Sequence, residues 1–114
     1  MKQEVKKDEK GTQPEKPALN DFIVHLKVEK GLTQSTVQVY VRDLRRFQVH
    51  LKTHGIFAFE AGGSRHIVEF LQLLREEGIS ARTQSRVLTA IRGLYRFLNR
   101  EGKIPGPSLS LIHL

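Results

Sequence analysis

Residues 80–102 read SARTQSRVLTAIRGLYRFLNREG, and their apolar and basic side chains separate with the period of an α-helix. At about 100° per residue, the apolar positions fill one arc of the helix and the basic positions fill the opposite side. Ser80 is expected to cap this helix, which ends near Arg100 with Gly102 beyond it. The arc expected to be buried holds Gln84, Val87, Leu88, Ile91, Leu94, Tyr95 and Leu98, and the side expected to be exposed holds Arg82, Arg86, Thr89, Gly93, Arg96 and Arg100.

Three further helices are predicted upstream, each from apolar residues at helical spacing and each followed by a glycine. They span about residues 18–30, 33–54 and 64–77, with Thr33 or Ser35 capping the second and Ser64 capping the third. Their inward positions are Leu19, Phe22, Ile23 and Leu26, then Val37, Tyr40, Val41, Leu44, Phe47 and Leu51, and finally Ile67, Phe70, Leu71 and Leu74.

The segment 55–63, GIFAFEAGG, is predicted to be a loop that returns Ile56, Phe57 and Phe59 to the core. No stretch alternates with the period of a β-strand, and the helices are joined by short connections. Helices joined in this way must pack against their neighbours. The sequence therefore predicts an all-α fold, a compact four-helix bundle over residues 18–104.

The two ends of the chain are expected to lie outside this domain. Residues 1–17 are rich in charge and contain Gly11, Pro14 and Pro17, which predicts a disordered tail, and residues 105–114 follow as a linker. No apolar run could span a bilayer or form a signal peptide, and the chain has no cysteine. These features predict a cytoplasmic protein with no membrane partner.

The chain is strongly basic, with 19 lysines and arginines against 12 acids, a net charge of +7 and a pI near 10.1. A surplus of this size makes a polyanion the leading candidate partner. Residues 81–100 hold five arginines and no acid, whereas an exposed helix without a binding role usually mixes both signs. Hydroxyl and amide residues begin the second and fourth helices, where free backbone N–H groups bind phosphate. They are Thr33, Gln34, Ser35 and Thr36 in the second helix and Ser80, Thr83, Gln84 and Ser85, together with Arg82, in the fourth. The third helix, with Glu69, Glu76 and Glu77, is a poor candidate for this surface.

No catalytic motif is present in the sequence. There is no nucleophile elbow, no phosphate-binding loop and no zinc-protease pair. His50 and His54 lie four residues apart, a spacing that can bind metal, but no third ligand is near them in the sequence. Tyr40 and Tyr95 lie along the apolar stripes, which favours a packing role. We therefore expect no enzyme activity, no metal and no cofactor.

Four stretches of the chain resemble the N-terminal core-binding, SAM-like domain of the tyrosine recombinase (phage integrase) family, and the Xer-type members in particular. The first, FIVHLKVEKGLTQSTVQVYVRDLRRFQVHL, carries the family pattern at Thr36, Tyr40, Asp43 and Leu44. The others are HIVEFLQLLREEGIS, SARTQSRVLTAIRGLYRFLNREG and the proline-containing IPGPSLSL. Together they run from about Leu19 to Leu111.

The resemblance implies an orthogonal SAM-like bundle that clamps duplex DNA through its second and fourth helices, together with a catalytic domain that follows the linker. It implies other recombinase protomers as partners, a bacterial or phage origin and a place near the nucleoid. The family's catalytic residues belong to the later domain, so this chain alone should not cut DNA. The DNA contacts it implies are Lys30, Thr33, Gln34, Ser35, Thr36, Gln38, Arg42, Ser80, Arg82, Thr83, Ser85, Arg86 and Thr89, to which the helical wheels add Arg45 and Arg96.

Within that set, Arg82 and Arg86 are expected to read bases and the others to hold phosphates. One alternative is a helical SAM-like interaction domain whose basic face docks an acidic protein, because fold alone does not decide between these uses. Another is a helix-turn-helix regulator, but the nine-residue loop 55–63 is too long for that motif.

Overall fold

The computed structural model describes residues 16–104, and within this range it contains helices and no β-strand. The helices are α2 (Lys16–Val24), α3 (Gln34–Thr53), α4 (Ser64–Glu76) and α5 (Ala81–Arg100). A π-helical turn, η2 (His25–Glu29), continues α2, and a 3-10 turn, η3 (Phe59–Ala61), precedes α4. The predicted all-α, four-helix fold is confirmed. The tail and linker predicted at the two ends lie, apart from residues 16 and 17, outside the described residues.

The helix ends follow from local chemistry. The Thr36 backbone N–H donates to Thr33 Oγ1 at 3.2 Å, and the Thr83 N–H donates to Ser80 Oγ at 3.2 Å, so both predicted caps form. The cap of α4 is Gly63 and not Ser64, a difference of one residue. Gly78 follows the C-cap residue of α4 and has a φ of 85°, a backbone conformation that residues with a Cβ rarely adopt.

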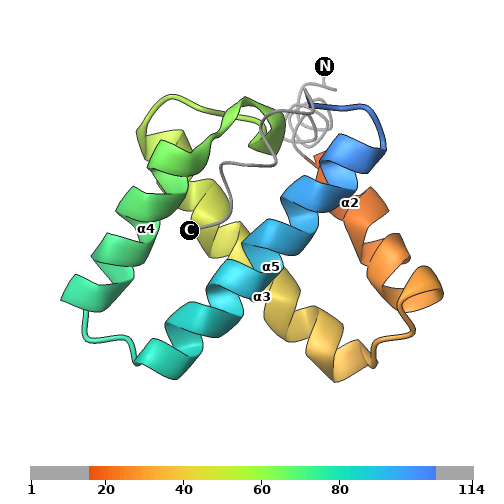
Figure 1. The fold of residues 1–114 in the computed structure, drawn as a ribbon, viewed down its shortest axis with the longest axis horizontal. Coiled ribbons are helices and arrows are strands. Elements are labelled where there is room, and N and C mark those ends of the chain that lie inside the picture. The colour runs from red at the N-terminus through yellow and green to blue at the C-terminus, as the bar shows by residue number, and fades with distance from the viewer. Residues whose placement is uncertain (1–15, 105–114) are drawn as a thin grey trace, which may run out of the picture.

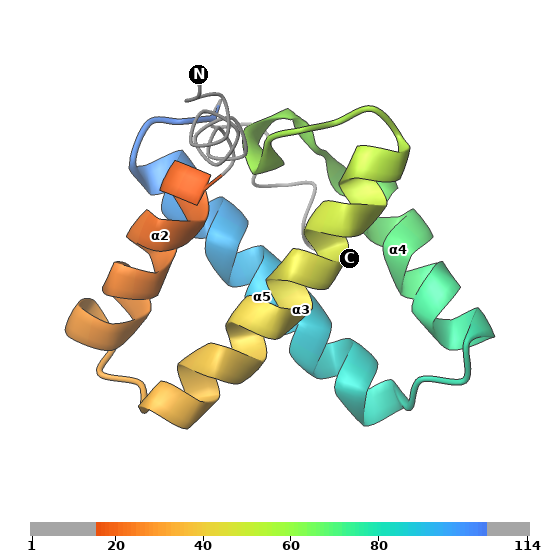
Figure 2. The same ribbon diagram turned by 180° about the vertical axis from the view of Figure 1, so that it is seen from behind.

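Helix α5 is the central element of the bundle. It crosses α3, while α2 and α4 lie on opposite flanks (Figure 1). Seen from behind, α3 lies in front of α5 with the same flanking arrangement (Figure 2). Helix α5 contacts α2, α3 and α4. In both views α3 and α5 begin at one edge of the molecule, here called the N-terminal edge, and end toward the opposite edge.

The core is built around aromatic side chains from every element. Phe22, Phe47, Phe59 and Phe70 are fully buried. The Tyr95 hydroxyl donates to the Phe59 carbonyl oxygen at 2.6 Å, which ties the loop before α4 to α5. Phe59 and Ile56 pack on the core as predicted, but the prediction for Phe57 is wrong because this residue is 62% exposed.

The expectation of one exposed basic side along α5 is also wrong in part. A Cβ on Gly93 would lie 3.3 Å from Phe22 Cζ, so this side of α5 faces α2. Ala90 and Phe97 are buried as well. A wheel with a single buried face does not describe a helix that packs against three others. The basic surface of α5 is therefore interrupted at its middle.

Candidate nucleic-acid interface

The N-terminal edge presents the first turns of α3 and α5 at its two ends, because the two helices cross between them (Figures 1 and 2). Neither helix has an acid in its first turn. Around Thr33 the hydroxyls form a small network, with Thr33 Oγ1 3.0 Å from Thr36 Oγ1 and 3.3 Å from Ser35 Oγ. Ser80 Oγ likewise donates to Thr83 Oγ1 at 3.2 Å. Because helix N-termini carry partial positive charge, this edge favours anions.

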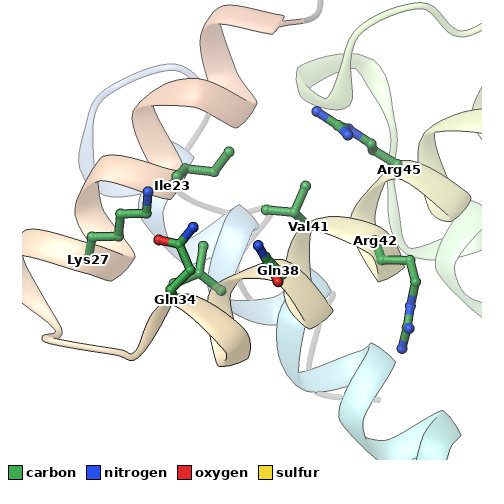
Figure 3. A pocket seen from close by; sticks show the side chains of 8 residues that line it. Ile23, Lys27, Gln34, Gln38, Val41, Arg42 and Arg45 are labelled. Atoms are coloured by element: carbon green, nitrogen blue, oxygen red, sulfur yellow. The ribbon is translucent and has the colours of Figure 1, made fainter.

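A groove of about 390 Å³ runs between α2 and α3 from this edge (Figure 3). Its polar lining includes Gln34, Gln38, Arg42 and Arg45, which are four of the predicted contact residues. Lys27 of η2, which sequence reasoning missed, lines it too. The three cations face no acid in the lining, and Ile23, Val37 and Val41 supply its apolar part.

A second hollow of about 300 Å³ lies among α3, α4 and α5 and brings Arg42 close to Thr83 and Arg86. Arg86 Nε donates to Asp43 Oδ2 at 2.9 Å, and its terminal nitrogen donates to Oδ1 at 3.1 Å. This hydrogen bonding raises the pKa of the Arg86 guanidinium, opposed by desolvation. The Asp43 side chain is only 6% exposed and that of Arg86 is 35% exposed, so the expectation that Arg86 stands free is wrong. Arg86 joins α5 to α3.

A third hollow, of about 550 Å³, lies between the α2–η2 segment and α5 and collects Lys30, Thr89 and Arg96. Arg100 lies at its end, where its terminal nitrogen is 3.2 Å from His25 Nδ1 and 3.4 Å from Glu29 Oε1. Arg100 is thus partly neutralised by an acid. Most of the predicted contact residues therefore fall into three hollows and two helix caps, while Arg82 and Ser85 are exposed near the start of α5, and the set does not form one continuous ridge.

Four predicted arginines keep their charge available. Arg42, Arg45, Arg82 and Arg96 are exposed, and none has an acid partner within the described part of the chain. The α4 flank differs, because Glu69 pairs with Arg65 at 3.3 Å and Glu77 pairs with Arg46. The predicted contact arginines without an acid partner therefore lie on α3 and α5, whereas the acids of the α4 flank pair with Arg65 and Arg46.

No third ligand lies near His50 and His54 in the sequence, but the fold brings a candidate beside them. Glu69 of α4 lies beside them, and one ligand atom from each of the three residues lies within 4.8 Å of the others. Burial, and then the neighbouring His54, lower the pKa of His50. This cluster could not be predicted from residue spacing, because Glu69 belongs to a different helix from His50.

Comparison with known proteins identifies the fold. The family model described as phage integrase, N-terminal SAM-like domain, matches residues 19–102. The chain belongs to this family. The resemblance drawn from the sequence is confirmed, and the predicted bundle is the family's SAM-like domain.

The curated relatives of this phage integrase SAM-like domain include Xer proteins. Tyrosine recombinase XerC of Pseudomonas putida is 37% identical over 87 residues, which cover 76% of this chain and 29% of the relative. XerC of Bacillus subtilis is 36% identical over 93 residues, with coverage of 82% and 31%. XerD of Mycobacterium tuberculosis is 37% identical over 91 residues, with coverage of 74% and 29%. The chain spans less than a third of these relatives. No solved structure matches it significantly.

This SAM-like domain has, in its described part, no helix long and apolar enough to cross a membrane.

Proposed function

We propose that this domain binds duplex DNA through the N-terminal edge and the grooves beside it, as the DNA-gripping part of a tyrosine recombinase. One observation carries the proposal. Two acid-free helix N-termini share an edge with exposed arginines that no described acid neutralises. Phosphates are the ligands that helix N-termini and guanidinium groups bind together. A cytoplasmic location beside the nucleoid is part of this proposal.

The residues divide into two roles within the proposed interface. The caps at Thr33 and Ser80, with their neighbours Ser35, Thr36, Thr83 and Ser85, hold phosphates through hydroxyls and backbone N–H groups. Arg82, at the start of α5, is the leading candidate for reading bases. Arg86 stays a predicted contact, but its bidentate pair with Asp43 gives it a positioning role first. Its guanidinium fixes α5 against α3, which sets the spacing of the two helix N-termini.

The larger protein is part of the same proposal. A catalytic domain after residue 114 would complete a clamp around the duplex and would cut DNA through a covalent phosphotyrosine intermediate. Other protomers would assemble on the same DNA. This domain alone would not cleave, and its isolated affinity would lie near the nonspecific range of about 10⁻⁴ to 10⁻⁶ M.

Salt dependence separates DNA binding from the docking of an acidic protein. Fluorescence anisotropy with a labelled duplex, repeated over a series of NaCl concentrations, gives the slope of log affinity against log salt. If about five phosphates are neutralised, that slope is roughly −4.5. Absence of binding at low salt, or a slope near zero, would favour the protein-docking alternative.

A charge-matched pair of double variants locates the interface. Arg82→Gln with Arg45→Gln removes two unpaired cations, so we expect the affinity to fall and the salt slope to become shallower by about two. Arg65→Gln with Lys103→Gln removes the same charge from the start of α4 and from beyond the end of α5, at the opposite edge (Figures 1 and 2). Equal losses in the two double variants would show that net charge, and not this edge, drives binding.

A further inference from the structure

A cluster of two imidazoles and a carboxylate lies between α3 and α4, toward the edge opposite the N-terminal edge. His50 and His54 lie one turn apart near the end of α3, and Glu69 belongs to α4. The two imidazole rings are 4.7 Å apart and nearly perpendicular. His54 Nε2 lies 3.7 Å from Glu69 Oε1, too far for a hydrogen bond. The three groups thus converge without bonding one another.

Two polar atoms in this cluster have no hydrogen-bond partner. They are His50 Nε2 and Glu69 Oε1, and both are shielded from solvent. Buried polar atoms without a partner are uncommon, because each loses its hydrogen bonds to water on folding. Both orphaned atoms belong to residues of the three-residue cluster whose candidate ligand atoms gather here. An ion between them would satisfy both at once.

Neighbouring contacts hold these side chains in place. The His50 ring packs against Phe47 and Phe70, with ring centroids 6.4 and 5.4 Å away. Arg65 Nε donates to Glu69 Oε2 at 3.3 Å, which leaves Oε1 facing the imidazoles. Partners of this kind orient ligands in metal sites. His66 is close to His54, but its Nδ1 accepts the Gly63 N–H at 3.3 Å, so in the neutral ring Nε2 carries the proton and cannot serve as a ligand.

We propose that His50, His54 and Glu69 form a binding site for one divalent transition-metal ion of the Zn²⁺ class. Two imidazoles and a carboxylate are a known ligand set for zinc, and a solvent molecule would complete four-fold coordination. Zinc–ligand bonds of about 2.0–2.1 Å place tetrahedral ligand atoms roughly 3.4 Å apart. The present spacing, within 4.8 Å, closes to that value by small side-chain rotations. The side chains of His54 and Glu69 are each 39% exposed, so the ion has a route from solvent.

The ion would cross-link the end of α3 to α4 and hold the loop between them. This role is independent of DNA binding, because the cluster lies at the edge opposite the proposed DNA interface (Figures 1 and 2). Since imidazole nitrogen dominates the ligand set, Zn²⁺ should be preferred over hard cations such as Mg²⁺, which favour oxygen.

Titration of the untagged, metal-free 114-residue chain with ZnCl2 tests the proposal. Calorimetry should show one strong site per chain. Thermal unfolding followed by circular dichroism should shift upward by on the order of 10 °C at a free metal concentration a hundredfold above Kd. MgCl2 should leave the unfolding midpoint unchanged. No heat and no shift with ZnCl2 would overturn the proposal.

Matched variants identify the ligands. His54→Gln and Glu69→Gln should each weaken Zn²⁺ binding by at least about tenfold. Glu76→Gln, a carboxylate lost elsewhere on α4, and His113→Gln, an imidazole lost near the C-terminus, should bind as the unaltered chain does. Equal affinity in all four variants would place the metal elsewhere and overturn the assignment. Should a ligand variant not fold, Co²⁺ titration of the unaltered chain decides, because d–d absorption typical of tetrahedral nitrogen and oxygen ligands is expected and its absence contradicts the site.

Discussion

The guanidinium of Arg86 spans both oxygens of the Asp43 carboxylate, and this pair joins the two helices that carry the proposed interface. Residue spacing placed Arg86 on the basic side of its helix, but the position of Asp43, 43 residues earlier, could not be obtained from that spacing. Arg86, which the sequence predicts to contact DNA, therefore first connects α5 to α3.

We expect Arg86→Ala to lower the free energy of unfolding by about 1–3 kcal/mol, because the nearly buried Asp43 carboxylate loses its partner. Urea denaturation measures this loss. The double variant Asp43→Asn with Arg86→Gln replaces the ion pair by a pair of amides and should recover part of the lost free energy of unfolding. No change in stability for Arg86→Ala would mean that solvent satisfies Asp43 in the folded state.

Tyr95 is a second residue whose role depends on a distant contact, its hydroxyl bonding the Phe59 carbonyl. Tyr95→Phe leaves that carbonyl without its partner, so we expect a loss of about 1 kcal/mol in the free energy of unfolding at neutral pH. Urea denaturation of the two proteins side by side gives the difference. A Phe variant as stable as the parent would show that the bond contributes nothing net.

Burial raises the pKa of the Tyr95 hydroxyl above its ordinary value of 10.0, with a smaller contribution from Glu60. The folded state therefore keeps its proton at pH values where the unfolded state releases it. Stability from this group is fully present below pH 10 and is lost as pH rises above it. The stability of the unaltered chain should fall more steeply above pH 10 than that of Tyr95→Phe, and parallel curves would contradict this account.

The helices themselves were predictable from the sequence, because apolar periodicity, hydroxyl caps and terminal glycines all act locally. The predicted second and fourth helices match α3 and α5 closely. What could not be predicted was the number of neighbours that each helix has. Gly93 illustrates this point, since it shares an angular position with arginines yet faces Phe22.

The first turn of α5 offers a test in which stability and DNA binding change in opposite directions. Ala81 is exposed and begins the helix, so Ala81→Glu places a carboxylate at the positive end of the helix dipole. We expect stability to rise by about 0.3–1 kcal/mol and DNA affinity to fall. Gln72→Glu adds the same charge to an exposed position on α4 and serves as the control. An Ala81→Glu variant that binds DNA no more weakly than Gln72→Glu would remove this helix end from the proposed interface.

Taken whole, the molecule has two edges with different chemistry. One edge collects two acid-free helix N-termini and the grooves that hold unpaired arginines, and the other holds the His50, His54 and Glu69 cluster. The sequence indicates which two helices carry most of the positive charge, because their basic residues are visible along each helix. The second edge depends on side chains from α3 and α4 meeting in space, which no spacing in one helix reveals.

Mapping of backbone amide NMR signals during titration of the isotope-labelled chain with a short duplex locates the bound DNA residue by residue. If DNA binds at the N-terminal edge, the largest shifts occur at the first turns of α3 and α5, around Thr33–Thr36 and Ser80–Ser85, and they fade as salt is added. Shifts concentrated on α4, or an unchanged spectrum at low salt with excess duplex, would contradict binding at this edge.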